Sequence, residues 1–202
     1  MFLANKNYRD EFESLLVKGL IPAGYKITKG VTLDPLSESS KYSGLVFSID
    51  EKKIVYRKGK VTTDRPGAFL AIWQRPFVDS LNDNKPIPLT SNDLDYLFVQ
   101  VTSQTSVKAI EGSVKSTQHG MFIFPIALLL EKGIVSSTKN KGKTGFRVFP
   151  PWSQNRGEIG TKVFSESGKK TQRWQLPYFV DIDKNGLIKP DQLDKILCHK
   201  NF

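Results

Sequence analysis

The chain is poor in the residues that build disulfide frameworks and metal centres. Cys198 is its single cysteine, and His119 and His199 are its two histidines. One cysteine excludes an internal disulfide and a cysteine-based zinc site, and it agrees with a reducing compartment. His119 has no histidine, cysteine or paired carboxylate at ligand spacing, so we interpret it as a surface or packing residue. Cys198, close to the end of the chain, is not expected to be a nucleophile.

Long hydrophobic runs and the common catalytic motifs are also missing. The longest apolar run, residues 121–130, is interrupted by Pro125 and is about half as long as a membrane-spanning helix requires. The N-terminal segment turns acidic before a signal-peptide core could form. There is no Gly-x-Ser-x-Gly elbow, and the GKT at 142–144 lacks the first glycine of a P-loop, since Ser137 takes that position. We therefore expect a cytoplasmic protein that is not a nucleotide triphosphatase.

Positive charge and aromatic residues are what the chain has in plenty. It carries 30 Lys and Arg against 20 Asp and Glu, with 3 Trp, 6 Tyr and 13 Phe. The charge is local: residues 52–75 hold seven basic residues and one acidic, and residues 132–174 hold ten basic and two acidic. Both segments also contain aromatics, which favours a polyanion partner. Two solvated faces that keep the protein soluble are the alternative.

The pattern of apolar residues predicts a single α+β domain over residues 1–202, with a central mixed sheet and flanking helices. Helices are expected at 7–18, 125–130 and 190–197, where apolar residues follow helical spacing or a proline leads the first turn. Strands are expected at 43–49 and 53–61 as a hairpin, and at 25–28, 68–74, 96–102, 121–124, 146–149 and 178–182. The strand at 96–102 is almost wholly apolar and should be buried on both faces.

Two basic segments are candidate nucleic-acid contacts. In residues 139–152, KNKGKTGFRVFPPW, flexible lysines could follow phosphates and a rigid Pro-Pro could hold Trp152 for base stacking. In residues 169–174, KKTQRW, Arg173 could grip a phosphate or stack on a base beside Trp174. The alternatives are a mobile hairpin tip with a packed Trp152, and a salt-bridged surface segment.

Three cations lie in the expected strand at 53–61. Period two places Lys58 and Lys60 on one face with Ile54 and Tyr56, and Arg57 on the other with Val55. Charge on both faces of a strand is costly unless it is paired or solvated, so at least one face should open into a groove. The alternative is a structural ion pair, with Glu38, Asp64 or Asp95 as the partner.

The residues resemble the MepB-like family over about 35–182. The resemblance rests on the run ESSKYSGLVFSIDEKKIVYRKGKVTTDRPGAFLAIWQRP and on GMFIFPIALLLEKGIVS, FRVFPPW and KKTQRWQLPYFVDI, which occur in the order of the family. It implies a fold related to the PD-(D/E)XK restriction endonucleases, with nucleic-acid binding as the activity.

The implied nuclease site is degenerate when it is laid onto this hairpin. The catalytic lysine falls on Lys60, the acid two residues earlier falls on Lys58, and the metal-binding Asp falls near Ser43. Asp95 resembles the acid that precedes the next strand. A lysine in an acidic slot repels Mg²⁺ and cannot bind it, so the metal-dependent mechanism is put in doubt.

We therefore predict a protein that binds nucleic acid, single-stranded DNA or RNA, in a nuclease-like cleft without a cofactor or a membrane partner. One alternative is a Mg²⁺-dependent nuclease with a shifted site of Glu38, Lys60, Asp64 and Asp95. Another is a basic module that binds an acidic protein. The expected contacts are Lys41, Tyr42, Arg57, Lys58, Lys60, Arg75, Lys141, Lys143, Arg147, Trp152, Lys170, Arg173 and Trp174.

Overall fold

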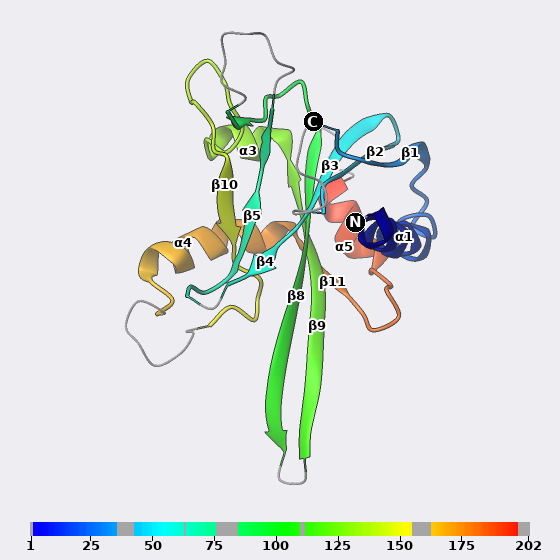
Figure 1. Cartoon of the computed structure of the whole chain (residues 1–202), viewed down its shortest axis with the longest axis vertical. Helices are drawn as coiled ribbons and strands as arrows, with labels where there is room; N and C mark the ends of the chain where they lie inside the picture. Colours follow the sequence, from blue (N-terminus) through cyan, green and yellow to red (C-terminus); the bar gives the residue numbers. More distant parts are fainter. Residues whose placement is uncertain are drawn as a thin grey trace.

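A six-stranded mixed sheet forms the centre of the molecule, as the α+β prediction requires. The structure is a computed structural model, and it describes residues 2–35, 43–62, 64–75, 85–109, 112–154 and 163–197. The strand order is β1-β2-β3-β8-β9-β11, and neighbouring strands are antiparallel except for the parallel pair β3 and β8 (Figure 1). The strands are β1 (Ile27–Leu33), β2 (Leu45–Ile49), β3 (Lys52–Lys58), β8 (Tyr96–Ala109), β9 (Gly112–Pro125) and β11 (Phe179–Ile182).

The expected hairpin at 43–61 is present as β2 and β3, joined by a two-residue turn. Asp50 and Glu51 both have positive φ, at 46° and 66°, and Ile49 pairs with Lys52. This conformation matches the twist of the two strands and so fixes their register. The expected strand ends differently: β3 stops at Lys58, and after Gly59 the chain enters β4 (Lys60–Val61) in another sheet.

β8 and β9 are much longer than the expected strands at 96–102 and 121–124. Their pairing runs without a break from Tyr96 opposite Pro125 to Ala109 opposite Gly112, and it forms the arm in Figure 1. Only the inner part of each strand is apolar, which is why the sequence predicted short strands. Leu97, Phe98 and Val99 are fully buried, so the prediction that β8 is covered on both faces is confirmed.

Different layers cover the two faces of the central sheet. One face packs against α1 (Phe2–Gly19) and α5 (Pro190–Leu197), with Phe12, Leu16 and Leu193 buried between them. The other face packs against a three-stranded sheet in the order β10-β5-β4, with β5 (Ala68–Ala71) and β10 (Gly145–Val148), and against α3 (Ile126–Glu131). A short pair, β6 (Trp73–Gln74) and β7 (Ile87–Pro88), follows β5.

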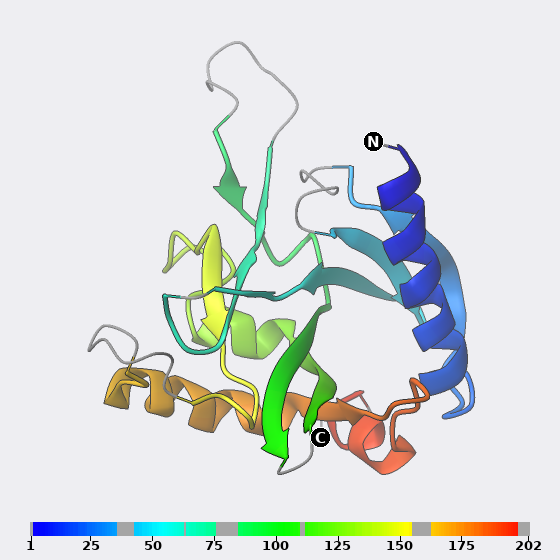
Figure 2. The ribbon, with the colours of Figure 1, turned by 60° about the horizontal axis from the view of Figure 1, so that its bottom comes forward.

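Helix α4 (Glu166–Gln175) was not predicted. Its buried side is formed by Gly168 and Gln175, so it lacks the apolar spacing by which a helix is usually recognised. Ser165 caps its first turn by accepting a hydrogen bond from the Gly168 backbone N–H. The chain then passes through a short 3₁₀ turn (Leu176–Tyr178) into β11. Figure 2 shows α1 and α4 on different sides of the central strands.

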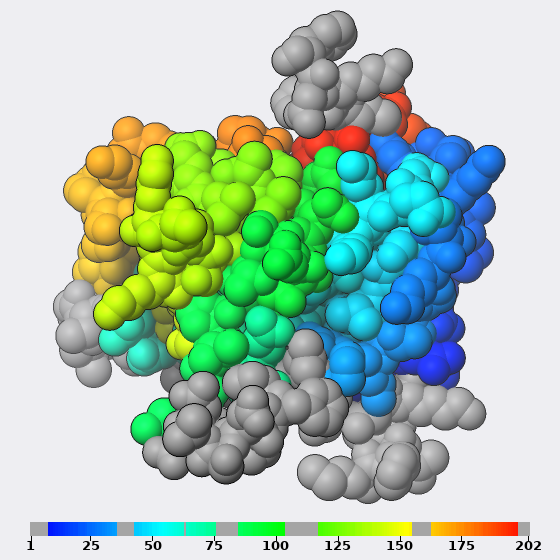
Figure 3. Space-filling view, turned by 90° about the horizontal axis from the view of Figure 1, so that it is seen from above, coloured from blue at the N-terminus to red at the C-terminus, as the bar shows by residue number. Residues whose placement is uncertain are grey.

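The end of the molecule opposite the arm shows the layers side by side. In Figure 3 the segments follow one another from α4 through the α3–β10 region and the start of β8 to the β2–β3 hairpin and β1. Among the described residues, no helix is both long and apolar enough to span a bilayer.

Candidate nucleic-acid interface

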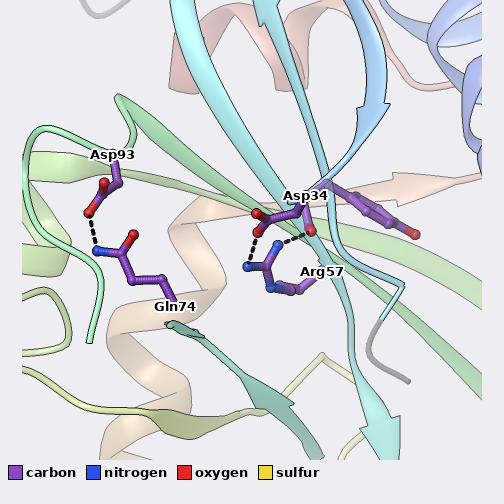
Figure 4. A network of polar contacts seen from close by, with 5 residues as sticks. Asp34, Arg57, Gln74 and Asp93 are labelled. Atoms are coloured by element: carbon purple, nitrogen blue, oxygen red, sulfur yellow. Dashed lines mark hydrogen bonds and ion pairs between the residues drawn. The ribbon is translucent and has the colours of Figure 1, made fainter. Parts of the chain in front are cut away.

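Arg57 lies inside the protein and not on an open cleft. Its side chain is 1% exposed, and Nη2 donates to the Asp34 carboxylate at 2.5 Å while Nη1 donates to the Tyr56 carbonyl at 2.9 Å (Figure 4). Burial lowers the pKa of Arg57, and the charge of Asp34 acts in the opposite direction. The structural ion pair is therefore the correct alternative for Arg57, and the partner that the structure shows is Asp34, which the sequence did not suggest.

Asp34 was missed because it stands in a loop-like sequence with no motif around it. Its backbone N–H donates to the Gly44 carbonyl, which places it beside the start of β2. Ser43, the position that the resemblance gave to a metal-binding Asp, is the neighbour of Gly44 in the chain. A carboxylate is thus present close to this position, and the guanidinium of Arg57 neutralises it.

The shifted nuclease site is not assembled by the described residues. The Asp95 carboxylate accepts a hydrogen bond from the Lys53 backbone N–H, at the first end of β3. Lys58 ends the same strand, about 16 Å further along, and Lys60 follows it. Asp64 is exposed near Arg147, and Glu38 lies outside the described residues. No group of three or more metal-binding side chains occurs in the described part of the chain.

Lys60 and Arg147 come together on the outer face of the three-stranded sheet. Lys60 of β4 and Arg147 of β10 both pair directly with Phe69 of β5. Directly paired residues project from the same face of a sheet, so the three side chains form a row of cation, aromatic and cation. We call Lys60, Phe69 and Arg147 the basic row. Phe69 is 37% exposed although it is apolar, and its ring lies over Gly145, where a Cβ would come within 2.6 Å of it.

Arg147 is oriented by neighbours from the β4–β5 connection. Its Nη2 donates to Thr62 Oγ1 at 2.9 Å, its Nη1 donates to the Pro66 carbonyl at 3.3 Å, and the Asp64 carboxylate is 3.9 Å away. The hydrogen bond from Thr62, followed by the charges of Arg147 and Arg65, lowers the pKa of Asp64. Asp64 is therefore a carboxylate at neutral pH, and it lies beside the basic row.

A groove continues from Arg147 along α4. Its first part is a hollow of about 350 Å³, which also contains Lys143, Lys132 and Trp174. The Lys132 ammonium lies over the Trp174 ring, 5.7 Å from its centroid, and the ring packs against Phe124. Lys143 is fixed to the body by its backbone N–H, which donates to the Ile134 carbonyl at 2.8 Å. The structure thus gathers Lys143, Arg147 and Trp174 of the expected contacts in one place.

The other expected contacts lie outside this groove. Lys141 is exposed on the loop before β10, and Lys170 and Arg173 are exposed on α4, with Arg173 on the side turned away from the groove by helical geometry. Arg75 lies over the Trp73 ring at 5.0 Å, and Trp152 packs edge-on against Phe179 at 5.5 Å. Lys58 is exposed at the end of β3 in the central sheet. Lys41 and Tyr42, like Cys198, lie outside the described residues.

Phe69 and Lys132 are residues of this surface that sequence reasoning missed. Phe69 stands in the apolar run AFLAIW, where period two alone marks it as outward-facing. Lys132 follows an apolar helix and belongs to a segment already marked as basic, but nothing in its neighbourhood distinguishes it.

The comparisons with known proteins agree with this fold. Residues 37–181, more than two thirds of the chain, match the family described as MepB-like. The chain belongs to the MepB-like family. It is also similar to a solved structure titled "Crystal Structure of MepB", with 29% identity and a TM-score of 0.57 over 77% of this chain and 87% of that chain. No curated protein matches the chain. The predicted family and the α+β class are confirmed.

Proposed function

We propose that this MepB-like protein binds single-stranded nucleic acid across the outer face of its three-stranded sheet. The observation that carries the proposal is the basic row. An exposed aromatic ring between two cations offers one surface for a base and two for the phosphates on either side of it. Strands fix all three positions, so the surface exists before a ligand arrives and little ordering entropy is lost on binding.

The charges beside the row extend the same surface. Lys143 in the groove adds positive charge next to Arg147, where Asp64 is the nearby acid. Lys132 lies in the same groove and is paired with Glu131 at 2.6 Å. Lysines and arginines at a groove contact the backbone without reading bases, so binding should be strongly salt-dependent and only weakly selective in sequence. The groove holds no converging carboxylates among the described residues, and we therefore propose binding without cleavage.

The test is fluorescence anisotropy with a labelled single strand over a salt series, with and without Mg²⁺, followed by a gel of the products. The expected result is binding that weakens steeply with salt and leaves the strand intact in Mg²⁺. Cleavage that requires Mg²⁺ would contradict the non-catalytic proposal. Absence of binding at low salt would contradict the proposal altogether, and it would leave the basic surface to an acidic protein.

Phe69→Leu separates base stacking from charge attraction. Leucine keeps an apolar contact over Gly145 but has no ring, so affinity should fall by roughly tenfold while the salt slope stays the same. Leu187→Ala, at an exposed apolar residue beyond β11, is the matched control and should leave affinity unchanged. Equal affinities for Phe69→Leu and the unmodified protein would show that the ring takes no part.

A further inference from the structure

The groove has a second hollow, of about 300 Å³, on the other side of Arg147. Arg147, Phe149 and Thr171 line both hollows and so form the boundary between them. The second hollow adds Arg65, Ser165, Ser167 and Gly168, and its lining is completed by Pro66, Val163 and Phe164. Its volume is at the lower end of the range for small-ligand sites, which suits one nucleotide and not a run of bases.

One wall of this hollow is built for an anion. Arg147 is oriented by Thr62 and Pro66, and the Arg65 side chain is 68% exposed, with the Asp64 carboxylate 3.5 Å from its Nε. Two guanidinium groups therefore lie beside the exposed Asp64 carboxylate at this wall. A planar guanidinium group can bind two oxygens of one phosphate, and Ser165 and Ser167 in the lining supply hydroxyls of the kind that contact phosphate.

The floor of the hollow is aromatic. Phe149 and Phe164 stack with their ring centroids 5.1 Å apart and an angle of 24°, and each is 9% exposed. Gly168 permits this floor, because a Cβ at that position would come within 2.8 Å of the Phe164 ring. A chain that crosses the basic row and enters here meets these two rings, and the hollow has room for one nucleotide at the end of a strand.

We infer that this hollow binds the terminal nucleotide of a single strand through its phosphate monoester. The inference rests on the proposed function and deepens it. A terminal phosphate carries a charge of about −1.5 to −2 at pH 7, against −1 for an internal phosphodiester, so two arginines distinguish the two groups. Arg147 belongs to both the row and the hollow, and it connects the internal contacts to the terminal one.

The experiment compares the affinities of strands of one sequence that differ only at their ends. The probes are a strand with hydroxyl ends, the same strand with a 5′-phosphate, the same strand with a 3′-phosphate, and a hydroxyl-ended strand two nucleotides longer. The longer strand matches the added charge without a monoester. One phosphorylated end should bind about fivefold more tightly than the longer strand, and the end that does so identifies the direction of the strand.

Two variants test whether the hollow is responsible. Arg65→Ala should remove the preference for the phosphorylated end, because Arg65 is exposed and lies in this hollow alone, while the hydroxyl-ended strand keeps its affinity. Lys195→Ala, on α5 behind the other face of the central sheet, makes the same charge change and should retain the preference. Equal affinity for phosphorylated and charge-matched strands would overturn the inference and leave the proposed function standing. Absence of binding by every strand would overturn both.

Discussion

Arg57 and Arg147 are both strand arginines from basic runs, yet they lie in opposite environments. Arg57 is 1% exposed and faces Asp34 inside the protein, whereas Arg147 is 19% exposed and faces Thr62, Pro66 and Asp64 at the edge of a groove. A buried cation must be neutralised where it lies, because water cannot solvate it. A partly exposed cation keeps its attraction for ligands. A charged residue in a strand therefore says little about ligand binding until the exposure of its side chain is known.

Removal of the buried acid should produce the largest effect. Asp34→Ala leaves the Arg57 guanidinium buried without its partner, which should lower the free energy of unfolding by about 3–5 kcal/mol. Urea denaturation followed by tryptophan fluorescence measures it. Asp64→Ala, which removes the exposed acid near Arg147, is the matched control and should leave the urea midpoint unchanged. Similar losses in both variants would break the distinction between the two arginines.

Much of the fold could be predicted from the sequence, because buried strands and helices place apolar residues at regular spacing along the chain. The β2–β3 hairpin, the doubly buried β8 and helix α5 all follow from apolar spacing and turn residues. The arm and α4 do not, because polar strand residues can pair as well as apolar ones and because α4 buries Gly168 and Gln175. Local patterns cannot report such elements, since tertiary contacts decide them.

The candidate site was predicted only in part, and the reason is again geometric. Period two places Lys58 and Lys60 on one face, but the break at Gly59 sends them into different sheets. The row joins residues from three strands, of which β10 lies far along the chain from β4 and β5. No single strand reveals the register that aligns Lys60, Phe69 and Arg147. Charge and aromatic composition identified the segments of the candidate site. The pairing of strands in the sheet decides which residues of those segments lie side by side.

Lys58 and Lys60 offer the next test, because only Gly59 separates them in the sequence. Lys60→Ala should reduce affinity for a single strand by roughly five- to tenfold at 0.1 M salt and reduce the salt slope by about one, as expected for one lost phosphate contact. Lys58→Ala carries the same charge change at the end of β3 and should leave both nearly unchanged. Anisotropy titrations over a salt series measure both quantities. Equal losses would mean that net charge, and not the basic row, attracts the strand.

Asp64→Asn should have the smallest effect and the opposite sign. Asp64 lies 3.9 Å from the Arg147 guanidinium and 3.5 Å from that of Arg65, so it competes with phosphate for both. Because its pKa is lowered, the carboxylate stays charged through its usual titration range and is neutralised only at a lower pH. The substitution should therefore raise affinity by about twofold to the same extent from pH 5.5 to pH 8. Lower affinity in Asp64→Asn would show instead that Asp64 supports the orientation of Arg147, and that the row depends on its acid as Arg57 does.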